Sequence, residues 1–369
     1  MSNDGAPVRQ PRISADSHMT EPLDLWEKGM PERFRPHAQR YSASAHQPGH
    51  VRAGGWDPRA RLKDMAADGI CAEVLYPTRG KDMYRQDGGS ELAEASARVY
   101  NDWMIDFCRE APDRLWGQAE IPLWDMSYAL AELERTKKAG LKGATIWMIP
   151  PSDLPFTSDH YEPFWAAAQE LEMPVSMHIN TGFGPYGSER DSHRGDFVES
   201  VAFTCGGHKA IAMRALTEMI CSGVFERYPQ LAIVIAELEV GWIPFWLEDL
   251  DRRFIKGTGQ RHFSLLPSEY FQRQVYATFT QDEVGGYLLS RHGAQNFMWS
   301  NDYPHEGCIW PYSDEVIELT LSHLPTAVQA QVLCENVAKL YGMPVPQPMP
   351  RTEVTDREHL WERPWIKTA

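Results

Sequence analysis

The feature that most constrains the fold is a regular alternation along the chain of short apolar segments and longer segments with helical periodicity. Eight such repeats are what a closed barrel of parallel strands and outer helices requires. A doubly wound open sheet has the same alternation, but no glycine-rich phosphate loop follows the first apolar segment. We therefore predict one α/β domain, a (β/α)8 TIM barrel over residues 1–343. The eight expected strands cover residues 12–18, 71–77, 114–122, 142–150, 173–179, 231–238, 274–279 and 296–302.

Three segments depart from this alternation. Residues 31–57 and 180–200 are long irregular stretches after the first and fifth expected strands, and long loops in compact domains often cover functional sites. Residues 344–369 are rich in proline and carry two tryptophans. We predict a C-terminal arm that packs either on its own barrel or on a neighbouring subunit, and the second arrangement would make the protein a homo-oligomer.

Composition restricts the partners. The chain of 369 residues has 36 Lys and Arg against 51 Asp and Glu, a formal charge of −15, which argues against nucleic acid or an anionic membrane as a partner. No apolar run reaches the roughly 20 residues of a bilayer span, and the N-terminus lacks an apolar signal segment. Six scattered cysteines without a CxxC pair indicate reduced thiols. We expect a cytoplasmic protein that acts on a small molecule.

Side chains able to bind a metal follow four of the expected strands, at the end where barrel enzymes place their chemistry. Asp16 and His18 occupy alternate positions of one strand, so both side chains point the same way. Glu237 ends the apolar run AIVIAE, and a buried carboxylate needs a partner such as a metal ion. We therefore predict a metal site at the barrel mouth. The expected ligands are Asp16, His18, Glu21, His178, Glu237, Asp302 and His305, with Glu239 and His208 as weaker candidates.

The ligand types narrow the choice of metal. Carboxylates and imidazoles without a thiolate suit Fe, Mn or Zn. Six or seven ligands exceed the four of a typical zinc centre, and they could instead fill two octahedral ions bridged by carboxylates.

An apolar pocket is expected above this site, because the chain contains 13 tryptophans, and aromatic side chains commonly line small-molecule pockets. Basic residues in the loops after the second and fifth strands could bind an anionic group. The expected pocket residues are Trp147, Trp242, Trp299, Trp310, Arg190 and Arg194, with Arg79 and Lys81 as further candidates.

The strand-end motifs also carry a family likeness. Between about residues 12 and 343, ADSHMTEP, PVSMHINTG, IVIAELEVGWIPFWLEDLD and MWSNDYPH resemble the amidohydrolase-related family of metal-dependent barrels, which includes hydrolases and nonoxidative decarboxylases. The chain departs from that family in three ways. Its first strand has Asp16-x-His18 in place of His-x-His, and Leu238 stands where the decarboxylase branch has a histidine. No lysine ends the fourth strand, since Lys142 lies at its start.

Within that family, the Asp-x-His-x-x-Glu-Pro start and the glutamate before GWIP resemble barrel-type nonheme diiron monooxygenases. The resemblance implies two Fe ions, with Mn or Zn as substitutes, together with dioxygen and an external reductant from an electron donor. It implies hydroxylation of an unactivated C–H bond in a small organic acid or acyl-CoA-linked substrate. The alternative is metal-dependent hydrolysis or nonoxidative decarboxylation, for which the resemblance implies Asp302 as general base. On this resemblance we expect Asp302 and His305 to be the catalytic residues. The full set of candidate ligands argues against a barrel without catalytic activity.

Overall fold

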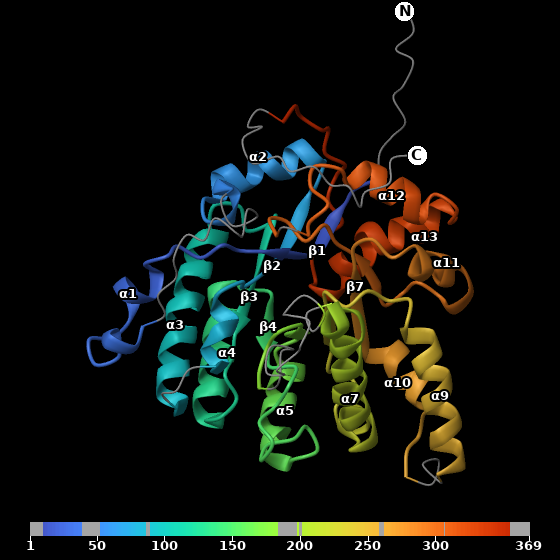
Figure 1. The fold of residues 1–369 in the computed structure, drawn as a ribbon, viewed down its shortest axis with the longest axis horizontal. Coiled ribbons are helices and arrows are strands. Elements are labelled where there is room, and N and C mark those ends of the chain that lie inside the picture. Colours follow the sequence, from blue (N-terminus) through green and yellow to red (C-terminus); the bar gives the residue numbers. More distant parts are fainter. Residues whose placement is uncertain are drawn as a thin grey trace, which may run out of the picture.

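The computed structural model describes residues 10–38, 52–85, 89–183, 198, 201–257, 262–305 and 307–354. Eight parallel strands form one sheet in chain order (Figure 1). The sheet curls until its two edges meet, where Asp302 N donates to Asp16 O (3.1 Å) and His18 N donates to Tyr303 O (2.6 Å). The predicted barrel is confirmed. Its strands are β1 Ile13–His18, β2 Ala72–Tyr76, β3 Leu115–Glu120, β4 Gly143–Ile146, β5 Val175–His178, β6 Ile233–Ala236, β7 Val275–Phe279 and β8 Phe297–Trp299.

Helices flank the strands, and several begin and end where local sequence signals predict (Figure 1). The helix α2 follows Asp57, whose carboxylate accepts the backbone N–H groups of residues 59 and 60, and it ends at Gly69 with a φ of 72°. Such an acidic cap and a left-handed glycine are favourable helix boundaries. The helices are α1 Leu25–Gly29, α2 Pro58–Asp68, α3 Gly89–Cys108, α4 Met126–Ala139, α5 Glu162–Glu170, α7 His208–Cys221, α8 Val224–Arg227, α9 Ile243–Lys256, α10 Pro267–Gln274, α11 Glu283–His292, α12 Ser313–Leu321, α13 Thr326–Ala330 and α14 Asn336–Leu340.

Side chains along each strand alternate between the outer helices and the barrel interior. In β3, Leu115 and Ala119 pack in the helix-facing core, whereas Trp116 packs inside the barrel. Gln118 also points inwards, because its Oε1 accepts a hydrogen bond from the Ser176 hydroxyl of β5 (3.5 Å). The same alternation directs the last residue of β3, a glutamate, into the barrel at its carboxyl end.

The described part of the C-terminal arm lies on its own barrel. Arg351 donates to Ala67 O (2.9 Å) and pairs with Asp314 (2.7 Å), and Thr352 N donates to Ala66 O (3.0 Å). These contacts attach the arm to α2 and α12. Both tryptophans of the predicted arm lie in residues 355–369, outside the described residues. Among the described residues, no helix combines the length and apolar character needed to cross a bilayer.

Candidate metal centre

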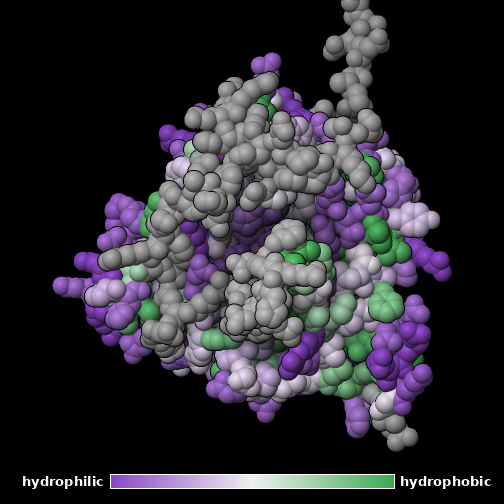
Figure 2. Space-filling view, viewed as in Figure 1, coloured by the Kyte–Doolittle hydropathy of each residue, from purple (hydrophilic) through white to green (hydrophobic). Residues whose placement is uncertain are grey.

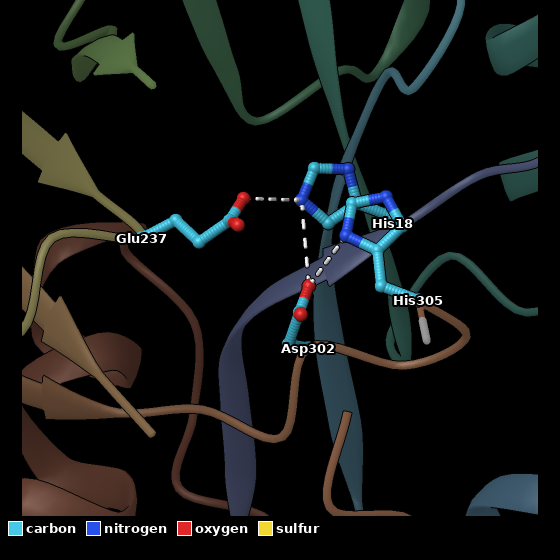
Figure 3. Close-up of side chains that lie close together, drawn as sticks. All are labelled: His18, Glu237, Asp302 and His305. Atoms are coloured by element: carbon cyan, nitrogen blue, oxygen red, sulfur yellow. Dashed lines mark ion pairs between the residues drawn. The ribbon is translucent and has the colours of Figure 1, made fainter. Parts of the chain in front are cut away.

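Histidines and carboxylates from four strand ends meet at the mouth of the barrel. His18 Nε2 lies 3.0 Å from His178 Nε2, and 3.5 Å, 3.6 Å and 3.7 Å from the nearest oxygens of Asp16, Glu237 and Asp302. Figure 3 shows the His18 ring facing the carboxylates of Glu237 and Asp302. Neighbouring ligands of one ion at about 2.1 Å are separated by roughly 3.0–3.4 Å. The spacing around His18 is therefore close to that around a single metal ion.

Three carboxylate oxygens at this point form no hydrogen bond of regular geometry, and imidazole nitrogens at 2.8–3.7 Å face them. The oxygens are Oδ1 of Asp16, Oε2 of Glu237 and Oδ1 of Asp302, the same atoms that lie nearest to the His18 nitrogen. Buried polar atoms are almost always satisfied, and each exception calls for an unseen ligand or another specific cause. The donor set therefore fits a divalent cation.

The second polar atoms of the His18, His178 and Asp16 side chains are held by the protein. His18 Nδ1 lies 3.1 Å from Pro77 O and His178 Nδ1 lies 2.8 Å from Ile179 O. The hydroxyl of Thr278 donates to Asp16 Oδ2 (3.0 Å). Contacts of this kind fix the tautomer and orientation of metal ligands, so both Nε2 atoms and Asp16 Oδ1 remain available.

Two groups of donor atoms share His18. One contains Asp16, His18 and His178, and the other contains His18, Glu237, Asp302 and His305. An imidazole nitrogen has one lone pair and binds one ion. Because both groups contain His18, an ion bound to its Nε2 lies within reach of donor atoms from both groups. This arrangement favours one ion rather than two.

His305 is tied to Asp302 rather than aimed at the centre. Its Nδ1 lies 2.8 Å from Asp302 Oδ1 and its Nε2 lies 2.9 Å from the hydroxyl of Thr78. Its ring stacks on that of His18 with a centroid distance of 3.8 Å. Both nitrogens are thus engaged, and the ring is placed to orient Asp302 or exchange a proton with it.

Left-handed backbones occur at three residues that follow strands at the site. Asn180, Glu237 and Asp302 have φ values of 60°, 61° and 55°. Such a conformation costs about 1–3 kcal/mol for a residue other than glycine and persists where the surroundings enforce it. Glu237 directly follows the last residue of β6 and ends it before the predicted residue 238. The strand β8 is also shorter than predicted, since it covers Phe297–Trp299 rather than 296–302.

The electrostatics reflect crowded acidic groups. Burial, with the charges of Glu237 and Asp16, holds the pKa of Asp302 well above its usual range. Burial lowers the pKa of His178, but its contacts with Asp16 and Glu237 outweigh burial and raise it to about 9. Burial also raises the pKa of Glu237, but hydrogen bonds with His178 and His18 outweigh it and hold that pKa well below its usual range. In the absence of a cation, protons on Asp302 and His178 thus reduce the negative charge of the cluster. A bound metal ion would balance the same charge.

Three other predicted ligands lie apart from the two donor groups. The carboxylate of Glu21 accepts the backbone N–H groups of residues 78, 79 and 80 at 2.9–3.1 Å. Glu239 similarly accepts the N–H groups of Thr280 (3.1 Å) and Gln281 (3.4 Å). His208 Nε2 lies 3.1 Å from Asn180 Oδ1. The carboxylates of Glu21 and Glu239 therefore support loops.

Of the four predicted pocket tryptophans, Trp147 lies among aromatic side chains beyond the end of β4. Trp299 packs in the helix-facing core, because its position in β8 points outwards. Trp310 donates to Asp64 O (2.8 Å) beneath the Arg52 guanidinium, and Trp242 donates to the carbonyls of residues 238 and 239. The structure therefore gives these three rings packing contacts rather than a place in the predicted pocket.

The structure describes two of the four basic residues that were predicted to bind an anionic group. Arg190 and Arg194 lie outside the described residues. Arg79 is engaged with Glu21, whose backbone carbonyl accepts from its guanidinium. Lys81 is half-buried, and its charge lowers the pKa of Asp302 and His305. Of the two described residues, Lys81 is the one whose charge acts on Asp302 and His305.

Glu120, at the end of β3, was missed by the sequence analysis. It is fully buried, its Oε2 accepts a hydrogen bond from the Tyr84 hydroxyl (3.0 Å), and its Oε1 has no hydrogen-bond partner. Burial raises its pKa to about 8, although the Tyr84 hydrogen bond opposes this shift. An available signal was the acidic residue that ends the segment RLWGQAE, the same pattern that identified Glu237.

The raised pKa of Glu120 predicts a pH-dependent stability. Between pH 4.5 and about 8 the folded chain keeps a proton that the unfolded chain has lost, so stability falls as pH rises through this window. Each pH unit contributes about 1.4 kcal/mol at most. Urea unfolding of metal-free protein at pH 5.5, 6.5 and 7.5 should show that Glu120→Gln lacks this part of the slope. Parallel curves for the two proteins would contradict the shift.

Comparison with known proteins places this geometry in context. The amidohydrolase family model matches residues 16–343. The chain is 29% identical over 263 residues to a γ-resorcylate decarboxylase of a Polaromonas species, covering 68% of this chain and 77% of the relative. Its fold resembles an amidohydrolase of Mycobacterium avium subsp. paratuberculosis, with a TM-score of 0.72, 17% identity, and 90% of this chain and 100% of that chain covered.

A second solved structure adds a bound metal. It is the 5-carboxyvanillate decarboxylase of Novosphingobium aromaticivorans in complex with manganese and 4-hydroxy-3-methoxy-5-nitrobenzoic acid. The TM-score is 0.70 at 19% identity, and 93% of this chain and 100% of that chain are covered. At this identity the likeness shows the fold alone.

These findings overturn the oxygenase hypothesis. The two relatives with a named reaction are decarboxylases rather than monooxygenases. The predicted hydroxylation is therefore wrong, and so is the prediction that the protein is an oxidoreductase. Two irons, dioxygen, an external reductant, an electron donor and a CoA-linked substrate have no support. The carboxylate-rich centre misled the prediction, because ligand types alone do not select the reaction. The alternative of nonoxidative decarboxylation is favoured.

Proposed function

Because the chain belongs to the amidohydrolase family, we propose that it is a metal-dependent, nonoxidative decarboxylase of a hydroxy-substituted aromatic acid. The observation that carries this proposal is the convergence of three carboxylate oxygens, none with a regular hydrogen bond, on two histidine nitrogens at single-ion spacing. The decarboxylase relatives supply the reaction class, and manganese is the metal proposed from the structural relative.

Asp16, His18 and His178 would hold the ion, and Glu237 and Asp302 would complete its set of ligands. When bound, the ion would supply positive charge to the oxygens of the substrate carboxylate and of a neighbouring ring hydroxyl. The orientation of both histidines is fixed by backbone carbonyls, so the centre is prepared before substrate arrives.

The reaction requires a proton and no oxidant. The bond between the ring and the carboxylate carbon breaks, its electron pair stays on the ring carbon and takes up a proton, and CO₂ leaves. We assign delivery of this proton to the pair formed by Asp302 and His305, whose nearest atoms lie 2.8 Å apart. Thr78 holds the other nitrogen of His305 at 2.9 Å, which keeps the pair aligned.

The test is CO₂ release under nitrogen. Manganese-loaded protein should convert one or more of 2,6-dihydroxybenzoate, 2,4-dihydroxybenzoate and 5-carboxyvanillate into the corresponding phenol and an equal amount of CO₂, at the same rate with and without oxygen. Metal-free protein is the control and should be inactive. Absence of CO₂ release across the panel with manganese, zinc and iron would reject the proposal.

A further inference from the structure

One side of the barrel mouth carries aromatic rings in place of candidate ligands. Tyr84, Trp124, Trp147 and Phe183, here called the aromatic wall, lie beyond the carboxyl ends of β2 to β5. Ring centroids are 4.9 Å apart between Trp124 and Trp147, 5.4 Å between Trp124 and Phe183, and 5.8 Å between Tyr84 and Trp147. Edge-to-face contacts of this kind make a rigid apolar surface suited to a flat ring.

The aromatic wall borders open space. Trp124 and Phe183 also line a cavity of about 890 Å³ that reaches Ile211 and Ala215 of α7. Figure 2 shows the molecule hollowed near the centre of the face that is viewed. Trp147 is fully buried, whereas Trp124 and Phe183 keep part of their surface exposed. The aromatic wall therefore offers apolar surface on which a bound aromatic ring could pack.

Glu120 places a carboxyl group next to these aromatic rings. Glu120 points into the barrel, and the Tyr84 hydroxyl of the aromatic wall holds its Oε2 (3.0 Å). Ser176 and Gln118 meet inside the barrel, so the residues two positions further along β5 and β3, His178 and Glu120, also point into the barrel at its carboxyl end. Glu120 Oε1 is buried without a hydrogen-bond partner.

Two other fully buried glutamates among the described residues differ from Glu120 in this respect. Glu73 pairs with Arg61, and Glu132 is bound by Arg135 and Asn101. Those two carboxylates are satisfied by the protein and have structural roles. The open Oε1 of Glu120 calls for a partner from outside the chain.

We propose that Glu120 binds a ring hydroxyl group of the substrate and so selects among hydroxylated aromatic acids. The inference rests on the proposed function and adds a specificity-determining residue to it. The aromatic wall would hold the ring by its faces and edges, and Glu120 would fix its rotation. Glu120 then positions the substrate, whereas Asp302 and His305 act on the reacting carbon.

The test compares the binding affinities of a set of aromatic acids for wild type and for Glu120 variants. Calorimetry on manganese-loaded protein would measure the binding of 2-hydroxybenzoate and of the 2,3-, 2,4-, 2,5- and 2,6-dihydroxybenzoates. In wild type, at least one added hydroxyl should tighten binding about tenfold or more, as expected for a hydrogen bond in a buried site. Glu120→Gln keeps a donor and an acceptor and should retain this gain, whereas Glu120→Leu should reduce it to below about twofold.

The controls separate the inference from general damage. Glu94→Gln, a half-buried carboxyl on α3, should leave every ratio unchanged. If Glu120→Leu does not fold, Tyr84→Phe/Glu120→Leu removes the unpaired Tyr84 hydroxyl and takes its place. A hydroxyl gain that persists in the leucine variant, or no gain in wild type, overturns the role of Glu120 while CO₂ release stands. Failure of wild type to bind any of these acids or to release CO₂ overturns both proposals.

Discussion

Replacing His178 with alanine is expected to abolish tight binding of the divalent ion and, with it, decarboxylation. Its Nε2 lies 3.0 Å from His18 Nε2 and 3.1 Å from Glu237 Oε2, at the point where both candidate groups meet. Altering a group that only orients a ligand weakens metal binding about 10–100-fold, so loss of a ligand should exceed about 100-fold. Metal content after dialysis, measured by mass spectrometry, should fall from about one ion per chain to near zero.

The matched control for this variant is His292→Ala, which removes an exposed histidine at the end of α11 and should keep its metal. Wild-type protein with two tightly bound ions would contradict the single-ion assignment, because the two donor groups share the one available nitrogen of His18. An alanine variant that keeps a full ion and full activity would place the metal elsewhere in the chain.

Replacing Asp302 with asparagine is expected to lower the rate of decarboxylation about 10²–10⁴-fold, the usual contribution of a positioned acid or base. Asparagine tolerates the left-handed backbone that this position requires, where φ is 55°, so the fold should survive. It cannot pass a proton to the ring. Rates for the acids that wild type converts should be compared with their affinities, and kcat should fall more than binding.

Deuterium incorporation gives a second test of proton transfer by Asp302 and His305. In D₂O, wild type should place deuterium on the ring carbon that lost CO₂, and His305→Gln should slow this step while retaining the ion. A rate for Asp302→Asn within about threefold of wild type would exclude Asp302 as the proton donor. Loss of the ion in Asp302→Asn would show that its main role is metal binding.

Much of the fold could be predicted from the sequence, because its signals are local. The alternation of apolar segments with helical stretches predicts eight strands, and a chain that repeats this pattern has few ways to bury both faces of a parallel sheet. Caps such as Asp57 and stops such as Gly69 act within one helical turn. Strand ends were less predictable, since the left-handed backbones of Glu237 and Asp302 are imposed by tertiary contacts.

The convergence of the site was also predictable. Six of the seven candidate ligands fall within the two donor groups, because the carboxyl ends of parallel barrel strands share one mouth. The reaction was not predictable in the same way. A cluster of carboxylates and imidazoles suits several metals and several reactions, and the decarboxylase relatives, rather than the ligand types, decide between decarboxylation and oxygenation.

The sequence by itself determined the barrel, the positions of its strands and the collection of acids and imidazoles at one end, because these follow from short-range periodicity and from the parallel arrangement. Only the tertiary structure decided how each side chain is used. It satisfies the carboxylate of Glu21 with three backbone N–H groups, turns Trp299 away from the mouth and leaves an oxygen of Glu120 without a partner. Hydrogen-bond satisfaction depends on residues far apart in the chain, and no local pattern encodes it.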